Sequence, residues 1–263
     1  MERGQKKSPD FVQSLARGLE ILEIIGKSSG AVTVAEVSEH TDINRATSRR
    51  LLLTLERMGY IKKTRNKYVL TPRVMELGFS YLSGIGISDL VAEELASGAE
   101  KISESLSLTT IDGFEIVYVA RAQSKKVMTV ALNVGARLPA WNTSMGRVLL
   151  SHSSDQEIEA LFEASMPVEP KTKYSKTSLG GFMDEIQKVR KLGYCIVDQE
   201  LELGLRSVAL PILRNGECLF AVNAATANVL EPVDETLTRL LPELEHVANK
   251  ITSIISLRVS NSF

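Results

Sequence analysis

The sequence predicts an α+β protein made of two parts: a small basic helical domain that ends in a hairpin, and a larger domain with an antiparallel sheet. Three observations support this prediction. Basic residues concentrate near the N-terminus, and apolar residues recur there at helical spacing. The remainder alternates strand-like and helical runs, and two of its runs contain Asp-Gly or Asn-Gly, which favour tight hairpin turns.

The composition is that of a soluble globular protein. The chain has 263 residues, of which 44% are hydrophobic and 24% charged, which is enough for two modest domains. Its first ten residues are charged with no apolar run behind them, so no secretory signal is expected, and no apolar stretch is long enough to cross a bilayer. Cys195 and Cys218 lie in strand-like stretches and are expected to be buried thiols. We therefore predict a cytoplasmic protein without a membrane partner.

The charge is unevenly distributed along the chain. Residues 1–80 carry 14 lysine and arginine residues against 9 aspartate and glutamate residues, whereas the remainder carries 17 against 23. The window 42–67 holds eight basic residues and only two acidic ones. A protein that is neutral overall but basic in one short segment is a candidate for binding a polyanion through that segment.

The basic segment is preceded by two predicted helices. The first is indicated by apolar residues at helical spacing that are expected to pack inward, namely Leu15, Leu19, Leu22 and Ile25. It is expected to end at Gly26. Thr33 and Glu36 form a capping-box pattern, which predicts the start of a short second helix that runs to about His40.

A third helix is predicted from Arg45 to about Met58, with Asp42 or Asn44 able to cap it. Its predicted inward stripe consists of Leu51, Leu52, Leu55 and Met58. The positions expected to face water near its start are Arg45, Thr47, Ser48 and Arg49. Guanidinium and hydroxyl groups are the side-chain groups that contact base edges and phosphates in DNA. A helix, a tight turn and a second helix with a polar N-terminal end form the helix-turn-helix arrangement.

A basic hairpin is predicted directly after the third helix. Tyr60-Ile61 and Tyr68–Leu70 read as short strands joined by a basic tip, which would form a wing on the DNA backbone. The predicted DNA contacts are Thr33, Asn44, Arg45, Ala46, Thr47, Arg49, Arg50, Lys63, Arg65 and Lys67. The alternative is a helical domain whose solvated basic face contacts protein; the order of helices, cap, basic face and basic wing favours DNA.

A connector follows the hairpin and leads into the second domain. A helical stretch starts at Pro72, and the small residues of 83–86 have the composition of a hinge. The next helix is predicted from Ser88 to about Ser105, with inward positions Leu90, Val91, Leu95 and Ile102. The predicted domains are therefore a winged helix-turn-helix at 11–72, a linker helix and hinge at 73–87, and a larger domain at 88–257.

The larger domain mixes hairpins and helices. Hairpins are predicted at 109–119 and 208–222, and further strands at 127–134 and 194–197. Helices are predicted after the capping box of Ser154 and Glu157, over 182–192 with Gly193 as its end, and over 234–257. Pro242 is expected to break or kink the last helix.

Several motifs resemble one known family. Residues 12–19, 51–60 and 204–209 resemble the IclR family of bacterial transcriptional regulators, over about residues 11–257. Residues 143–150 and 198–202 are most similar to its β-ketoadipate-pathway branch, the PcaR, PcaU and PobR type. The resemblance implies a winged helix, a linker helix and a GAF-like effector domain, assembled as dimers or tetramers, and an effector that is an aromatic acid or its ring-cleavage product. Trp141-Asn142 departs from the family, where a smaller aromatic residue or histidine is often followed by alanine.

A candidate effector site lies where the loop from Gly135 enters a helix. The free amides at a helix N-terminus can bind a carboxylate. The predicted effector contacts are Trp141, Thr143, Ser144, Met145 and Gly146 on this segment, with Arg206, Ser207 and Asn223 on opposing strands. The alternatives are that Thr143 or Ser144 only caps the helix, that Trp141 only fills the core, and that Arg206 pairs with Glu200 or Glu202.

Catalytic patterns do not stand out in the sequence. The three histidines are scattered, and no zinc-ligand spacing, phosphate loop or Rossmann glycine pattern is present. We predict no cofactor, no metal and no enzymatic activity. The predicted function is a transcriptional regulator whose partners are an operator DNA, a small carboxylate effector and further copies of itself. A redox-responsive regulator using Cys195 and Cys218 and a GAF-type enzyme remain alternatives.

Overall fold

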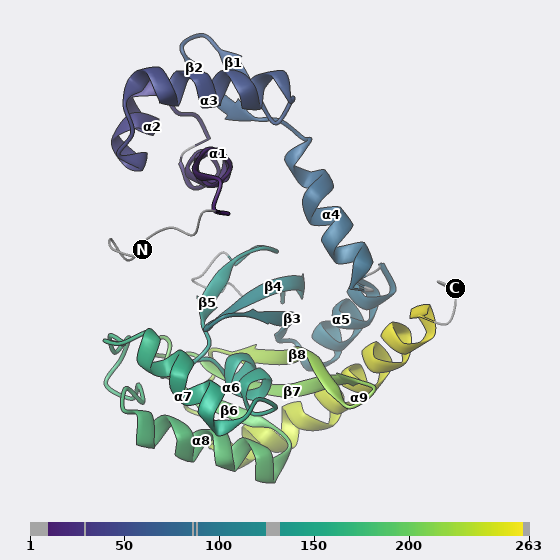
Figure 1. Ribbon diagram of the computed structural model, residues 1–263. Helices are drawn as coiled ribbons and strands as arrows, with labels where there is room; N and C mark the ends of the chain where they lie inside the picture. Colours follow the sequence, from purple (N-terminus) through teal and green to yellow (C-terminus); the bar gives the residue numbers. More distant parts are fainter. Residues whose placement is uncertain (1–9, 29, 86, 88, 125–131, 260–263) are drawn as a thin grey trace. The chain divides into compact units, whose positions relative to one another are not determined.

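The computed structural model describes residues 10–28, 30–85, 87, 89–124 and 132–259 (Figure 1). The chain divides into two compact units, Met1–Tyr81 and Leu82–Phe263, and this division lies within the predicted linker 73–87. Most of the strand predicted over 127–134 lies outside the described residues, and 132–134 form no strand. No single described helix is long and apolar enough to span a membrane, although α4 (Val74–Gly84) and α5 (Asp89–Ile102) pass that test together as a bent pair.

The first unit contains three helices and a hairpin, in the predicted order. Its elements are α1 (Gln13–Lys27), α2 (Val34–Thr41), α3 (Arg45–Arg57), β1 (Ile61–Thr64) and β2 (Lys67–Leu70), followed by the start of α4 (Val74–Gly84). Strands β1 and β2 pair antiparallel, with Thr64 opposite Lys67. This arrangement confirms the predicted winged helix-turn-helix.

Side-chain caps begin both helices of the helix-turn-helix. Thr33 and Glu36 form the reciprocal capping box, with a Glu36 N to Thr33 Oγ1 distance of 3.2 Å and a Thr33 N to Glu36 Oε2 distance of 2.6 Å. Of the two candidate caps for α3, Asn44 is the one used, since its Oδ1 accepts from Thr47 N at 2.9 Å. Asp42 instead ends α2 in a left-handed conformation.

The core of this unit confirms the prediction for α1 at Ile25 and contradicts it at Leu15 and Leu19. Ile21 and Ile25 are buried, whereas Leu15 and Leu19 are 62% and 52% exposed. The helix carries apolar residues on two faces, so spacing alone could not decide which face packs against α3. The prediction for α3 was wrong at Met58, which is half exposed, and at Ser48, which is buried and donates to Asn44 O.

The second unit is a sheet covered by helices on both faces. Its strands are β3 (Ser105–Asp112), β4 (Glu115–Ala122), β5 (Arg137–Pro139), β6 (Cys195–Asp198), β7 (Arg206–Arg214) and β8 (Glu217–Thr226). Its helices are α5 (Asp89–Ile102), α6 (Ser144–Leu150), α7 (Asp155–Ala164), α8 (Leu179–Leu192) and α9 (Val233–Val259). The strands pair antiparallel in the order β5-β4-β3-β8-β7-β6, which confirms the α+β prediction.

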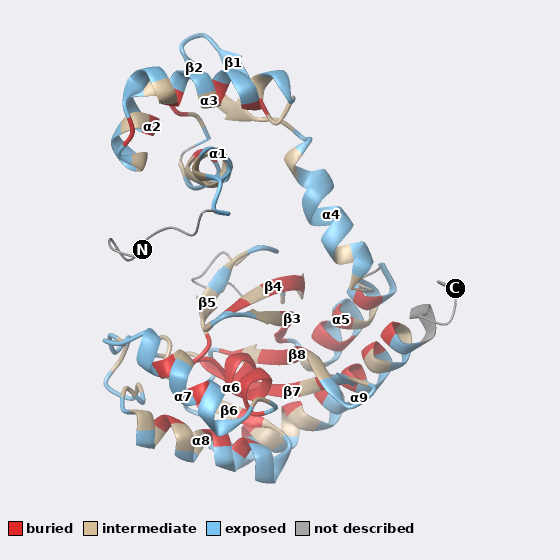
Figure 2. Ribbon diagram, viewed as in Figure 1, coloured by how far each residue is buried: buried red, intermediate tan, exposed pale blue. Residues whose placement is uncertain are grey.

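The two faces of the sheet differ in the size of their side chains. Helices α5 and α9 cover one face, and α6, α7 and α8 cover the other (Figure 1). Large apolar residues of β7 and β8, such as Val208 and Val222, belong to the hydrophobic cluster formed with α5 and α9. Figure 2 shows buried residues along these strands. The alternate positions on the opposite face include Ser207, Asn223 and Ala225, which are small or polar. Because those side chains fill less space, the sheet leaves room beneath α6.

Short sequence motifs correctly predicted one hairpin turn and one helix end of this unit. Asn215 and Gly216 both adopt positive φ, 53° and 85°, in the two-residue turn between β7 and β8. Gly193 ends α8 in a left-handed conformation, as predicted.

Pro242 was expected to break or kink the last helix; the break is wrong, because α9 continues through Pro242, and the kink stays a prediction. Leu240 and Leu244 are fully buried against the sheet and α5, and that packing outweighs one lost backbone hydrogen bond. Leu90, predicted to face inward, is half exposed.

Candidate functional site

The first unit carries a surface hollow between α2, α3 and the wing. Five of the predicted contacts line it, namely Thr33, Arg45, Ala46, Arg49 and Lys63. The side chains of Arg45, Arg49 and Lys63 form no salt bridge with any described residue. Arg45 and Arg49 lie one turn apart on α3 and so share a face. Three cations thus surround one hollow beside the start of α3, which suits a polyanion.

The other predicted contacts of this unit lie away from that hollow. Thr47 and Arg50 line a second, mainly apolar groove together with Leu15 and Leu19 of α1. Arg65 occupies the tip of the wing with a positive φ of 58°. Asn44 caps α3, and Lys67 is exposed in β2. The structure therefore separates Arg50 from Arg49, which neighbour each other in sequence.

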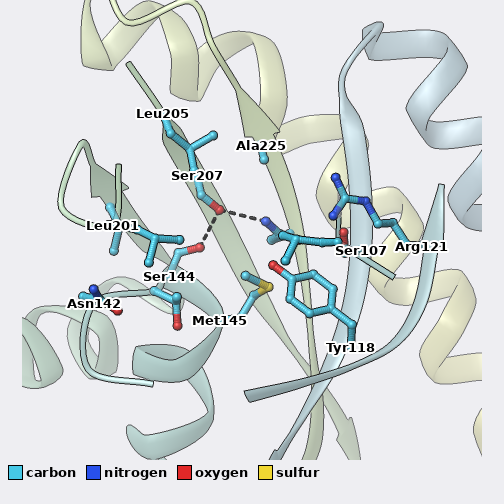
Figure 3. Close-up of a pocket in the computed structure, with 14 residues that line it drawn as sticks. Ser107, Tyr118, Arg121, Asn142, Ser144, Met145, Leu201, Leu205, Ser207 and Ala225 are labelled. Carbon is cyan, nitrogen blue, oxygen red and sulfur yellow. Dashed lines mark hydrogen bonds between the residues drawn. The ribbon is translucent and has the colours of Figure 1, made fainter. Parts of the chain in front are cut away.

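The second unit encloses a cavity between α6, the loop before it and the small-residue face of the sheet (Figure 3). Its lining consists of Ser107, Tyr118, Arg121, Leu132, Asn142, Thr143, Ser144, Met145, Val197, Leu201, Leu205, Ser207, Asn223 and Ala225. The cavity volume is about 40 Å³, which is enough for a few water-sized molecules. A larger ligand therefore requires flexible side chains such as Met145 and Leu201 to shift.

Five predicted effector contacts meet in this cavity: Thr143, Ser144, Met145, Ser207 and Asn223. Thr143 also caps α6, since its Oγ1 accepts from Gly146 N at 3.2 Å. The cap and the cavity lining are therefore compatible roles of one residue.

Three predicted contacts do not line the cavity, and the structure gives each another role. Trp141 is buried in the hydrophobic core. Gly146 faces the backbone of Ala140 so closely that a Cβ there would lie 2.2 Å from the Ala140 oxygen. Arg206 forms a structural ion pair, donating to both carboxylate oxygens of Asp198 at 3.0 and 3.1 Å. The predicted partners of Arg206, Glu200 and Glu202, are corrected to Asp198.

The polar groups of the cavity are incompletely paired. The Ser144 and Ser207 hydroxyls lie 2.7 Å apart, and Asn223 Nδ2 donates to Ser207 Oγ at 2.8 Å. Whichever serine donates within the pair, one hydroxyl proton is left over. Among the described residues, Asn223 Oδ1 and both polar atoms of the Asn142 side chain have no hydrogen-bond partner. Because an unpaired buried polar group costs about 1–3 kcal/mol, this pattern suits a cavity that holds water or a polar ligand.

The charge of the cavity favours an anion. Arg121 is the one charged residue among the described lining residues, and its guanidinium carbon lies 5.9 Å from the ring centroid of Tyr118. Burial raises the pKa of Tyr118 to about 12, so its phenol is neutral near pH 7. A cation and a neutral phenol can together hold a small carboxylate.

Four further polar residues line the cavity that were not among the effector contacts predicted from the sequence: Ser107, Tyr118, Arg121 and Asn142. A signal for part of this set was present. Ser107, Ser207 and Asn223 interrupt apolar strands at positions that share one sheet face, which is the period-two pattern of a polar hollow. No local pattern distinguishes Arg121 from an arginine at an exposed strand end.

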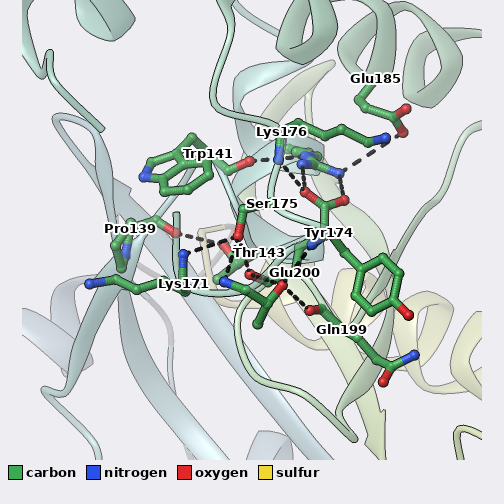
Figure 4. Close-up of polar contacts among 12 residues, drawn as sticks. Pro139, Trp141, Thr143, Lys171, Tyr174, Ser175, Lys176, Glu185, Gln199 and Glu200 are labelled. Atoms are coloured by element: carbon green, nitrogen blue, oxygen red, sulfur yellow. Dashed lines mark hydrogen bonds and ion pairs between the residues drawn. The ribbon is translucent and has the colours of Figure 1, made fainter. Parts of the chain in front are cut away.

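A buried ion pair supports one wall of the cavity (Figure 4). Arg147 of α6 is fully buried and donates to both oxygens of Glu200, at 2.8 and 2.6 Å. Its Nε donates to Trp141 O at 3.0 Å. Burial lowers the pKa of Arg147, but the bonds to Glu200 and the surrounding negative charge outweigh that effect and raise it, so the guanidinium stays charged.

Glu200 also holds two loops together. Its Oε2 accepts from Lys176 N at 3.2 Å, and its backbone oxygen accepts from Ser175 Oγ at 2.7 Å (Figure 4). Leu201, the next residue, and Leu205, five residues after Glu200, line the cavity. The ion pair therefore fixes the segment that forms this wall.

The redox alternative is disfavoured by the sheet topology. Cys195 lies opposite Ala209, which lies opposite Asn223, and Cys218 is five residues before Asn223. Strand spacing and rise therefore put the two cysteines about 15–20 Å apart. Bridged cysteines need Cα atoms within about 7 Å. Burial also raises the pKa of both thiols to about 12, which suppresses the reactive thiolate.

Comparisons with known proteins agree with this two-part geometry. Residues 14–65 match the IclR helix-turn-helix domain, and residues 79–253 match the bacterial transcriptional regulator IclR C-terminal domain. The chain is 38% identical over 240 residues to the Pca regulon regulatory protein of Pseudomonas putida, covering 90% of this chain and 81% of that protein. It is 31% identical over 256 residues to the p-hydroxybenzoate hydroxylase transcriptional activator of Acinetobacter baylyi, covering 95% and 94%. A crystal structure of a Rhodococcus sp. RHA1 protein superposes with a TM-score of 0.80 at 39% identity, covering 93% of this chain and 98% of that one.

Proposed function

Because this chain belongs to the IclR family of bacterial transcriptional regulators, and so is a DNA-binding regulator, we propose that its operator affinity is set by a small aromatic acid. The cavity beneath α6 is the proposed effector site. The observation that supports this most strongly is a cavity lined by one arginine and several asparagine atoms without a partner. The regulator would act in the cytoplasm, where its operator lies, and would carry out no catalysis.

The effector class is supported by the lining and by two relatives. Arg121 offers a cation for a carboxylate, and Tyr118 and Met145 offer walls for a ring. Relatives are named for the Pca regulon and for p-hydroxybenzoate hydroxylase, whose namesake substrate is an aromatic acid. Since the cavity is small, binding must move its walls, and that movement gives the ligand a different affinity for two arrangements of the protein.

The proposal is tested by measuring binding to the DNA that flanks this protein's own gene. Operator affinity is measured by fluorescence anisotropy with and without 4-hydroxybenzoate, protocatechuate and β-ketoadipate. We expect at least one aromatic acid to change the affinity at least fivefold, the lower range of allosteric coupling. If no compound changes either DNA binding or thermal stability, the effector assignment is wrong.

We also propose that two copies bind DNA together through the first unit. Leu15 and Leu19 of α1 line an apolar groove with Met58 and Leu77, and all four side chains are at least half exposed. An exposed apolar groove on a soluble protein indicates an interaction surface. A second copy is the fitting occupant, because paired recognition helices read half-sites one helical turn apart.

Replacing both Leu15 and Leu19 by glutamate is expected to weaken self-association more than tenfold. Burying a leucine contributes about 1.5–3 kcal/mol, and the introduced charges add a desolvation cost. Sedimentation equilibrium measures the effect. Leu192→Glu, an equally exposed site on α8, is the control. An unchanged dissociation constant in the double variant would remove α1 from the interface.

Arg65→Ala tests the wing. If the guanidinium neutralises one phosphate, removing it lowers the slope of log affinity against log salt by about one unit. Anisotropy titrations at several salt concentrations measure this slope. Lys27→Ala, at an exposed end of α1, is expected to leave it unchanged. A normal slope for Arg65→Ala would show that the wing tip does not touch the backbone.

A further inference from the structure

We propose that Asn142 is a specificity-determining residue, which selects effectors that carry a hydroxyl group in addition to their carboxylate. The inference rests on the proposed effector role of the cavity. It goes further by distinguishing hydroxylated aromatic acids from dicarboxylic ring-cleavage products.

The Asn142 side chain is fully buried in the cavity lining, and its backbone is held on both sides. Ala140 N donates to Phe114 O at 2.9 Å, and Trp141 O accepts from Arg147 Nε at 3.0 Å. On the other side, Thr143 Oγ1 donates to Pro139 O at 3.1 Å. With its neighbours fixed and Trp141 in the core, the backbone that carries the Asn142 side chain is held in place before any ligand binds.

That amide has no structural partner among the described residues. Its Nδ2 and Oδ1 are both buried without a hydrogen bond, although other polar groups nearby, Thr143 and Ser144, are paired. Buried asparagine atoms normally pair with protein groups or ordered water, so within this cavity the two atoms are open to water or to a ligand that displaces it. An unpaired donor and an unpaired acceptor therefore lie at one point of the cavity lining.

A ligand hydroxyl can satisfy both atoms, because it donates to Oδ1 and accepts from Nδ2. An ionised carboxylate can only accept, so the amide oxygen would face a negative charge. A methyl group satisfies neither atom. Asn223 Oδ1, also unpaired, likewise needs a donor. The amides therefore favour a hydroxyl over a second carboxylate.

The position of the arginine assigns the other end of the ligand. Figure 3 shows Arg121 and Asn142 on opposite sides of the lining, with Tyr118 and Met145 between them. A ligand that matches this spatial order has a carboxylate at Arg121, a hydroxyl near Asn142 and a flat apolar ring between them. The chemical class is a hydroxybenzoate or a close analogue.

The experiment measures ligand affinity of the full-length protein by isothermal titration calorimetry. The ligands are 4-hydroxybenzoate, benzoate, 4-methylbenzoate and terephthalate. For the wild type, we expect 4-hydroxybenzoate to bind at least tenfold more tightly than the other three. Asn142→Leu, which is nearly isosteric, is expected to weaken 4-hydroxybenzoate at least tenfold and to leave 4-methylbenzoate unchanged or tighter. Asn249→Leu, at an exposed asparagine on α9, is the matched control.

Thermal unfolding separates specificity from a structural role. Because Asn142→Leu removes two unpaired buried polar atoms, its Tm should equal or exceed that of the wild type; a large decrease in both Asn142→Leu and Asn142→Ala would indicate a structural role and overturn the assignment. If the leucine does not fold, Asn142→Ala provides the same ligand comparison. Equal wild-type affinity for all four ligands, or a hydroxyl preference that survives in the variants, overturns the role of Asn142 and leaves the effector cavity standing. No binding of any of the four overturns the aromatic effector itself.

Discussion

Replacing Arg147 by methionine is expected to destabilise the second unit by about 3–5 kcal/mol, because it leaves the Glu200 carboxylate buried without its cation. Methionine preserves much of the side-chain volume, so the loss reports charge and hydrogen bonding more than a cavity. For a domain of this size, about 2–4 °C is lost per kcal/mol. The expected result is a decrease in Tm of roughly 10 °C in calorimetry.

Arg137 is the matched control for this variant. It also pairs with carboxylates, at 2.7 Å to both Glu115 and Asp112, but its side chain is 41% exposed. Exposed pairs contribute about 0–1 kcal/mol, so Arg137→Met should change Tm by only a few degrees. If Arg147→Met lowers Tm no more than Arg137→Met does, the Arg147–Glu200 pair does not stabilise the second unit as proposed.

A double variant tests whether Glu200 is the reason for the loss. Adding Glu200→Gln to Arg147→Met removes the orphaned charge and should recover part of the stability. Effector affinity gives a second measure, because Leu201 and Leu205 follow Glu200 in the cavity wall. We expect the single variant to bind its effector more weakly even at temperatures where it is fully folded.

Features set by neighbouring residues were predictable from the sequence. The capping boxes at Thr33 and Ser154, the Asn-Gly turn and the helix end at Gly193 all formed as expected. Each depends on contacts within about four residues, which the sequence displays directly.

Features that depend on distant partners were not predictable. Arg147 and Glu200 lie 53 residues apart in the chain, and nothing local marks them as a pair. The choice of the Ile21 face of α1 over the Leu15 face also depends on what packs against it. Asn142 was noticed as a departure from the family, but its importance follows from burial without a partner, which only the structure reveals.

Arg49→Ala is expected to lower operator affinity by about 10- to 100-fold, the range that one arginine contact to a base edge can carry. Arg49 lines the hollow that also contains Arg45 and Lys63, and it forms no salt bridge with a described residue, so its charge is available to DNA. Affinity for unrelated DNA should fall much less, because only base contacts carry sequence information.

Arg50→Ala is the informative comparison, since the two arginines are adjacent in sequence but line different surfaces. If the hollow faces the major groove, Arg50→Ala should weaken specific and unrelated DNA equally and by less than Arg49→Ala. Competition anisotropy against unrelated DNA measures both ratios, with unfolding temperatures to confirm that the exposed substitutions leave the fold intact. A larger specific loss for Arg50→Ala would place the apolar-groove face of α3 on the DNA. That face could not then also serve as the proposed dimer surface, so this one measurement tests both assignments of the first unit.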